Sequence, residues 1–304
     1  MAADALPFWV LRLVLGLAVL GYGAYTDVMT RKASNSLWTA MALAGAGIMA
    51  MELLTIGAPS LLLLAPVIAL AVFFCIFLEG EFLPKGMAGE GANKAVMLAI
   101  LLGSIGGMYA MSTTLDPSFP DIAMVIVMMF VFYMFYVFGL IQGGADAKAL
   151  MSLAILCPWY PPTGLPFVFS TVPSMVSAVI PFSLSLLFNS AIMFIVVPLG
   201  LALHNASKGD FAGMMFLGYR MRIDDASNSF VWPMERVEGK KVVRIFFPSR
   251  DRRDLSRDLD ALRRMGRKKV WVTPKMPFLV PMTIGFIVTI MFGNILLGLM
   301  LFLL

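Results

Sequence analysis

Long apolar runs separated by short polar loops dominate the chain. A helix crosses the hydrocarbon core of a bilayer with about 20 predominantly apolar residues. The sixth apolar run has only 11 residues, so it must draw on flanking residues or be re-entrant, and the seventh is interrupted by Pro181 and Pro198. The pattern predicts an all-α polytopic membrane protein of about eight transmembrane helices, with spans near 7–26, 36–57, 61–78, 95–112, 122–141, 147–157, 174–203 and 278–304.

A different pattern occupies residues 204–277, where short apolar runs alternate with 17 basic and 9 acidic residues. "ERVEGKKVVRIFF" predicts a β-hairpin around Glu238 and Gly239. "SRDRRDLSRDLDALRRMGR" places leucines on one stripe and predicts an amphipathic helix that ends at Gly266, and "KKVWVTP" predicts a strand. We therefore expect a transmembrane helical domain (1–203), a small α/β domain (204–277) inserted before the last helix, and a C-terminal transmembrane helix (278–304).

Composition supports the membrane assignment. The 304 residues are 60% hydrophobic and only 13% charged, with a mean hydropathy of +0.88, whereas soluble domains carry about 25% charged residues. The two cysteines, Cys75 and Cys157, lie in apolar runs, and the chain has one histidine. We therefore expect no disulfide framework and no cysteine–histidine zinc site.

Basic residues predict the orientation. If the N-terminus lies outside, the loops 27–35, 79–94, 142–148 and 204–277 lie in the cytoplasm and contain 22 of the 23 basic residues. This distribution follows the positive-inside rule. The remaining basic residue, Arg12, is expected to snorkel to the outer surface, as is Glu52. The basic 204–277 domain favours contact with anionic membrane lipids, and we expect no nucleic-acid partner.

Two aspartates are expected to meet at the cytoplasmic edge of the membrane. Asp27 ends the first span going inward, and Asp146 opens the sixth span going outward, behind Gly143 and Gly144. Four complete spans separate them, so both carboxylates lie on the same side. Two neighbouring carboxylates share one proton, so one can act as a base on water while the other polarises a peptide carbonyl.

The residues alone leave three interpretations of these aspartates open. An aspartate at a helix start is often an N-cap, and Asp27 beside Arg31 and Lys32 fits an ordinary interfacial charge. Carboxylates within a membrane also bind ions in secondary transporters, which is our alternative to a protease. A scaffold protein would tolerate the loss of either aspartate.

"GGADAK", together with the upstream "YTDVMTRKASNSLW", resembles the archaeal preflagellin peptidases, a branch of the type IV prepilin peptidases. The resemblance implies an aspartic endopeptidase, without cofactor, that removes a short positively charged leader from preflagellin or pilin-like precursors. It also implies a six-helix core, so the surplus spans would lie between 58 and 120. The residues that it assigns are the catalytic pair Asp27 and Asp146 and the substrate-seating motif Gly143, Gly144, Ala145 and Lys148. Ala145 departs from the broader Gly-x-Gly-Asp pattern, which has glycine there.

Other protease classes lack their signatures. The single histidine, His204, has no Gly-x-Ser partner motif, and the zinc-protease motif His-Glu-x-x-His is absent. A basic leader needs a negative counterpart, and the loop "EGEFLPKGMAGEGANK" is the one predicted inner loop with an acidic balance. We therefore predict that Glu79, Glu81 and Glu90 contribute to leader binding.

Overall fold

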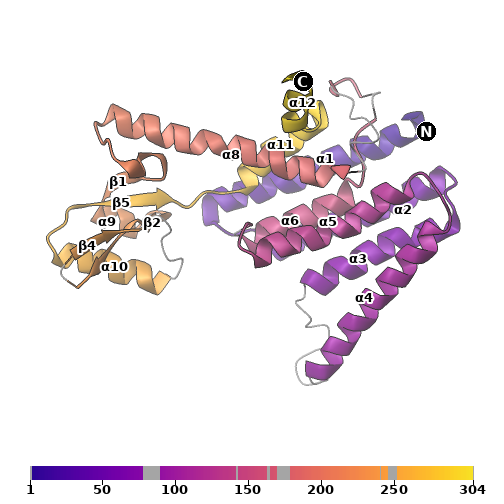
Figure 1. Ribbon diagram of the computed structural model, residues 1–304, viewed down its shortest axis with the longest axis horizontal. Coiled ribbons are helices and arrows are strands. Elements are labelled where there is room, and N and C mark those ends of the chain that lie inside the picture. Colours follow the sequence, from indigo (N-terminus) through magenta and orange to yellow (C-terminus); the bar gives the residue numbers. More distant parts are fainter. Residues whose placement is uncertain are drawn as a thin grey trace. The chain divides into compact units, whose positions relative to one another are not determined.

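The structure, a computed structural model, describes residues 2–77, 90–141, 143–162, 165–169, 179–239, 241–245 and 252–303. Its helices and strands are drawn in Figure 1. The chain divides into two compact units. The first, the membrane unit, comprises Met1–Met193 and Phe278–Leu304, and the second, the sheet unit, comprises Phe194–Pro277.

Every regular element in the described residues of the membrane unit is a helix. Six helices in the described chain are long and apolar enough to cross a membrane, the sixth being α8, which continues into the sheet unit. A multi-pass membrane protein is therefore confirmed, while the number of eight spans stays a prediction. The elements of this unit are α1 (Ala2–Thr30), α2 (Asn35–Thr55), the 3-10 helix η1 (Ser60–Leu63), α3 (Leu64–Phe77), α4 (Glu90–Ser112), α5 (Phe119–Val137), α6 (Gly144–Leu156), the first part of α8 (Phe182–Ser207), α11 (Leu279–Phe292) and α12 (Ile295–Leu303).

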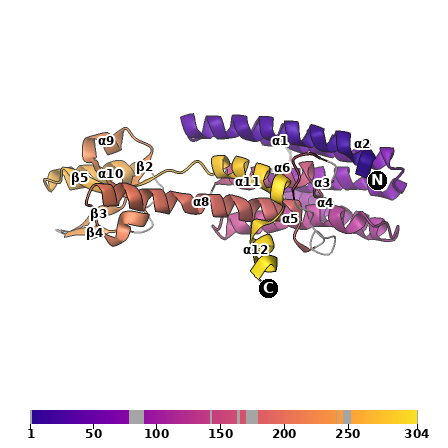
Figure 2. The ribbon, with the colours of Figure 1, turned by 90° about the horizontal axis from the view of Figure 1, so that it is seen from above.

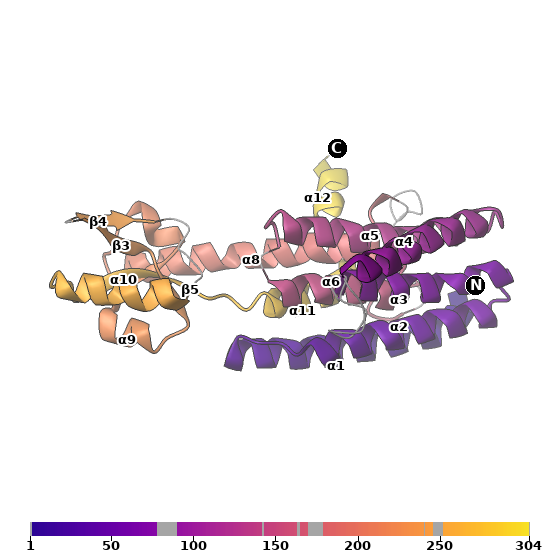
Figure 3. The same cartoon turned by 90° about the horizontal axis from the view of Figure 1, so that it is seen from below.

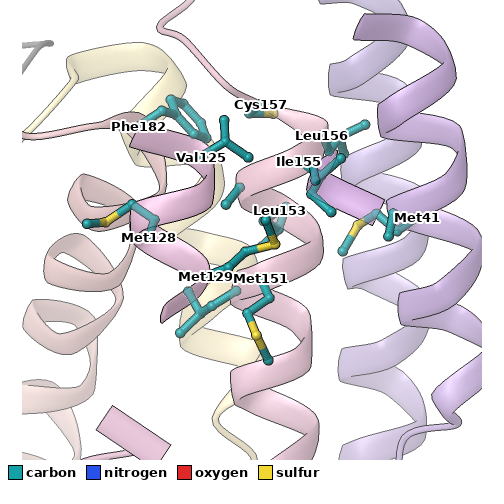
Figure 4. Packing of buried hydrophobic residues seen from close by; sticks show 14 of the residues in the cluster. Met41, Val125, Met128, Met129, Met151, Leu153, Ile155, Leu156, Cys157 and Phe182 are labelled. Carbon is teal, nitrogen blue, oxygen red and sulfur yellow. The ribbon is translucent and has the colours of Figure 1, made fainter. Parts of the chain in front are cut away.

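The short helix α6 forms the centre of the membrane unit. It packs against α2 on one side and α5 on the other, and Figure 4 shows its apolar side chains between Met41 of α2 and Met129 of α5. Every residue from Ala149 to Leu156 is buried. With 13 residues α6 is too short to cross a bilayer alone. Helices of the same chain surround it instead, which is why a short segment is stable there.

A glycine allows α2 and α6 to approach closely. A β-carbon added to Gly45 of α2 would lie 2.7 Å from the α-carbon of Leu156 and 2.8 Å from its backbone nitrogen. Backbone atoms cannot move aside as a flexible side chain can, so only glycine fits at this crossing. Close contact of this kind is how helices associate where the surrounding lipid is as apolar as their side chains. Figure 3 shows α1 running alongside α2, on the outside of the same bundle.

The predicted last span, 278–304, is not one continuous helix. α11 ends at Gly293, which has a φ of +66°, and α12 leaves in a different direction (Figure 2). Asn189 of α8 binds the exposed backbone at this break: its amide donates to the carbonyl oxygen of Gly293 at 2.8 Å and accepts from the N–H of Ile295 at 3.2 Å. A break in apolar surroundings needs such partners, because no water is present to satisfy the free backbone groups.

Arg12 and Glu52 do not snorkel, so that prediction was wrong. Their side chains are 0% and 3% exposed, and an Arg12 guanidinium nitrogen lies 2.5 Å from a Glu52 carboxylate oxygen. The indole of Trp159 donates a hydrogen bond to Glu52, and its ring lies 5.0 Å from the guanidinium carbon of Arg12. The two charges therefore satisfy each other inside the protein, which removes the need to reach water.

The sheet unit contains a three-stranded antiparallel sheet and a hairpin. β5 is central, with β1 and β2 on its two sides, and β3 pairs with β4. The hairpin around Glu238 and Gly239, the helix that ends before Gly266 and the final strand are confirmed, while β1, β2 and α9 were not predicted. The elements are the end of α8, the 3-10 helix η2 (Gly213–Phe216), β1 (Tyr219–Arg222), α9 (Ile223–Ser227), β2 (Val231–Pro233), β3 (Glu235–Glu238), β4 (Lys241–Arg244), α10 (Arg252–Arg264) and β5 (Lys269–Pro274).

The close approach of α2 and α6 gives a stability prediction with an internal control. Gly45→Ala should destabilise the protein by about 1–3 kcal/mol, because the methyl group meets the α6 backbone. Gly47→Ala, two positions further along α2, meets no atom within 4 Å and should be neutral or stabilise by about 0.5–1 kcal/mol, because alanine favours helix. Thermal unfolding in detergent measures both. Equal melting temperatures for the two variants would contradict the packing.

Candidate active site

Asp27 and Asp146 come together in the membrane unit. Asp27 lies in the last turn of α1, and Asp146 lies in the first turn of α6. Their carboxylates are close enough to repel each other electrostatically, and both side chains are only partly buried. Residues separated by more than a hundred positions thus form one carboxylate pair that retains access from outside the protein.

Two helix N-termini point at this pair. The Asp27 carboxylate accepts a hydrogen bond from the backbone N–H of Leu279, the first residue of α11. Phe278, which precedes α11, has no polar side chain to cap the helix, so the carboxylate of α1 performs that task. Asp146 is itself the third residue of α6. Since the N-terminus of a helix carries a partial positive charge, both helices stabilise negative charge at the pair.

Gly143 makes room for the carboxylate of Asp146. A β-carbon at position 143 would lie 2.2 Å from the Oδ2 atom of Asp146 and 2.9 Å from its Cγ atom. The carbonyl oxygen of Gly143 also accepts hydrogen bonds from the N–H groups of Asp146 and Ala147, both at 3.1 Å. Gly143 therefore caps the start of the helix and leaves space for the aspartate to fold back over it.

Gly144 is not crowded in the same way. The nearest atom to an added β-carbon there is the hydroxyl oxygen of Tyr136, at 3.6 Å, which is ordinary van der Waals contact. Tyr136 belongs to the last turn of α5, is exposed and was not singled out in the sequence. Its hydroxyl group therefore borders the start of α6, two residues before Asp146.

Lys148 connects α6 to α2 and α3. Its ammonium group donates a hydrogen bond to the side-chain oxygen of Asn35 at 3.3 Å and lies 4.1 Å from the centre of the Phe77 ring. Asn35 is the first residue of α2 and follows the turn after Asp27. The lysine of the motif thus holds the first turn of α6 against the α1–α2 connection, a contact that sequence spacing alone did not reveal.

The remaining predicted site residues are Glu79, Glu81, Glu90 and Ala145. Glu79 and Glu81 lie outside the described residues, and Glu90 opens α4. Ala145 lies in the first turn of α6, between the two glycines and Asp146. Among the described residues there is no group of three or more His, Cys, Asp or Glu side chains that could hold a metal ion.

The fold and this pair define a class of protein, a multi-pass membrane protein with two interacting aspartates at helix ends. Comparison with known proteins identifies the family. Residues 212–295 match the family described as "Archaeal Peptidase A24 C-terminus Type II". The preflagellin peptidase of Methanococcus voltae is 30% identical over 194 residues, which cover 61% of this chain and 77% of the relative.

Two further preflagellin peptidases are similar. That of Methanocaldococcus jannaschii is 26% identical over 55% of this chain and 69% of its own length. That of Methanococcus maripaludis is 24% identical over 66% of this chain and 84% of its own length. The chain belongs to the archaeal preflagellin peptidase family, and it is a protease by that membership.

The two motif glycines should respond differently to alanine. Gly143→Ala should lower peptidase activity about 100-fold, because the methyl group displaces the Asp146 carboxylate, and misplacement of about 1 Å costs that much. Gly144→Ala should lower activity less than Gly143→Ala does, because its methyl group meets only ordinary contacts within the protein. Turnover measured on purified protein of matched melting temperature checks both. Equal losses would show that the glycines serve a common purpose instead.

Proposed function

We propose that this chain is an aspartic endopeptidase that removes the short, positively charged leader of preflagellin, with Asp27 and Asp146 as its catalytic pair. The single observation that carries the proposal is the interaction of these two carboxylates, which come from the ends of two different helices. The family supplies the substrate class, because the relatives are preflagellin peptidases. Pilin-like precursors, which share a basic leader before a hydrophobic helix, are proposed as further substrates.

The pair performs hydrolysis with one proton shared between two carboxyl groups. The ionised carboxylate removes a proton from a water molecule, and the water oxygen attacks the carbonyl carbon of the scissile peptide bond. The protonated partner donates a hydrogen bond to the carbonyl oxygen, which develops negative charge. As the tetrahedral intermediate collapses, a carboxyl group returns a proton to the leaving amine, and the pair regains its initial charge.

The helix ends around the pair hold this geometry without further cofactors. The N–H of Leu279 orients the Asp27 carboxylate, and the space at Gly143 allows Asp146 to face it. We propose that Gly143, Gly144 and Ala145 lie against the scissile segment, with the Tyr136 hydroxyl beside it. A hydroxyl group in that place can bind a backbone group of an extended substrate.

We also propose that the pair and the 204–277 segment face the cytoplasm and that the segment's basic surface contacts membrane lipids. The proposal for the orientation rests on the distribution of basic residues between alternate loops. The loop 79–94, with Glu79, Glu81 and Glu90, is proposed to bind the basic leader through opposite charge.

Removal of either carboxylate tests the mechanism. Asp27→Asn and Asp146→Asn should each lower leader cleavage by about 10³-fold or more, because neither amide can exchange a proton as a carboxyl group does. The purified variants are incubated with a preflagellin, and the cleaved product is measured, with and without EDTA. Tyr25→Phe, an exposed change two positions before Asp27, is the control and should retain full activity.

Robust cleavage by either asparagine variant would contradict the paired mechanism. Loss of wild-type activity with EDTA would indicate a metalloprotease instead. Uptake of a solute into proteoliposomes, without any cleavage, would favour the alternative of a secondary transporter.

Cysteine labelling tests the orientation. Lys32→Cys and Ser256→Cys should react with a membrane-impermeant maleimide only in inverted vesicles, and Thr113→Cys only in intact cells. All three positions are exposed in the structure. Background from the native cysteines should be low, because Cys75 and Cys157 are buried. Labelling of positions 32 and 256 from opposite sides would show that an odd number of spans separates them.

A further inference from the structure

A basic hollow in the sheet unit has no role in the proposed cleavage. It has a volume of about 700 Å³ and lies between the central strand β5, the β3–β4 hairpin and the loop that follows α10. All of these elements belong to one compact unit. The charged side chains that line it are the carboxylate Glu235 and the basic residues Arg220, Arg244, Arg267, Lys268 and Lys269.

The alternation of side chains along β5 places the hollow on one face of the sheet. Val270 and Val272 belong to the apolar cluster that includes Leu259 and Leu262 of α10. Trp271, between them, belongs to a separate cluster with Met214 and Met234. Successive residues of a strand point to opposite faces, so Trp271 lies opposite the two valines that α10 covers. Trp271 lines the hollow, and Val270 borders it as well.

Basic residues lie on the same face of the sheet as Trp271. Arg220 of β1 pairs directly with Trp271 in the sheet, and its guanidinium carbon lies 5.3 Å from the centre of the indole ring. Lys269 lies two residues before Trp271 on β5 and therefore shares its face. Gly266, with a φ of +75°, ends α10 and turns the chain toward β5. Arg267 and Lys268 thereby become part of the rim.

Charge in the hollow is unbalanced. Five basic side chains face one carboxylate, Glu235, which is 7% exposed. Arg220 also forms an ion pair with Asp210 at 3.2 Å. Among the ion pairs of the described residues in this unit, none involves Arg244, Arg267 or Lys268. Like charges held together around a concave surface repel one another, and an anion in the hollow would relieve that repulsion.

We propose that this basic pocket binds a phosphate-bearing anion of the size of a phospholipid headgroup. Arginine side chains present forked N–H donors that match the oxygen atoms of a phosphate group, and lysines add point charges. A volume of about 700 Å³ exceeds what inorganic phosphate needs and suits a phosphate with an attached polar group. The unit is also continuous in sequence with apolar helices at both ends, α8 and α11, which favours a membrane lipid as the source of the phosphate.

Binding of soluble phosphate compounds to the full-length protein tests this proposal. Protein in a neutral detergent is titrated by calorimetry with short-chain phosphatidylglycerol, with short-chain phosphatidylcholine and with inorganic phosphate. The phosphatidylglycerol should bind with one-site stoichiometry and at least tenfold more tightly than the zwitterionic lipid. Its affinity should fall as salt increases, because the charges are screened.

Two double variants locate the site. Arg244→Gln/Lys268→Gln removes two exposed charges of the pocket lining, one from β4 and one from the loop after α10, and should weaken binding at least tenfold. Arg257→Gln/Arg264→Gln removes the same charge from exposed positions on α10, which covers the other face of the sheet, and should weaken it less than twofold. Both doubles keep the apolar clusters, so they should retain the wild-type melting temperature.

Three other outcomes would each contradict part of the proposal. Equal weakening by the two doubles would mean non-specific attraction to a basic surface, and the pocket would not be a site. Pocket-dependent binding of inorganic phosphate as tight as that of phosphatidylglycerol would identify a free phosphate rather than a lipid headgroup as the ligand. Pocket-dependent binding of an oligoglutamate peptide, with no binding of either phosphate compound, would overturn the proposal in favour of an acidic protein partner. Leader cleavage is measured in parallel, so failure of this proposal is distinct from failure of the proposed function.

Discussion

The contact between α2 and α6 is the constraint on which the membrane unit depends. α6 carries Asp146 at its start, but it is too short and too enclosed to be held by the bilayer. Its position is set by the α2 backbone at Gly45, where the backbone of Leu156 lies too close for any β-carbon. α2 in turn follows α1 through a turn of four residues, 31–34, and α1 carries Asp27. The tight packing of α2 against α6 thus fixes the positions of α1 and α6, and this brings the two carboxylates together.

Two groups of polar side chains inside the membrane unit bind other parts of the chain rather than water. Asn189 supplies hydrogen bonds to the break after α11, and the Arg12–Glu52 pair neutralises itself against Trp159. Both arrangements stabilise the fold only if distant helices come together. A broken buried ion pair costs on the order of 3–5 kcal/mol, because it leaves an unpaired charge in apolar surroundings. They therefore make the arrangement of helices specific.

Sequence periodicity predicted the elements that depend on local composition. The apolar runs matched α1 to α5 closely, and counting of spans brought Asp27 and Asp146 to one side. The same reasoning failed where long-range contacts decide. Arg12 was expected to reach water because its partner, forty residues away, cannot be seen from local charge. β1 and β2 have four and three residues, and such short strands exist only because β5 pairs with both.

In the candidate active site, too, the sequence predicted local features and missed long-range contacts. The motif identified Asp146 and its glycines, yet Leu279, Asn35 and Tyr136 contact the site through backbone position or helix packing, which spacing does not encode. The motif also treats its glycines as equivalent, and the structure separates them. Gly143 precedes α6, and its missing side chain is the space that Asp146 occupies.

The position at which α6 starts explains why residue 145 can be alanine rather than glycine. Glycine is required where the backbone adopts a positive φ or where another group needs the space of a β-carbon. Neither condition holds at position 145, because α6 begins at Gly144 and residue 145 is already helical. Alanine is the best helix former, so it stabilises the turn that carries Asp146. The departure from Gly-x-Gly-Asp therefore strengthens the first turn of α6 without removing the one glycine, Gly143, on which the position of the carboxylate depends.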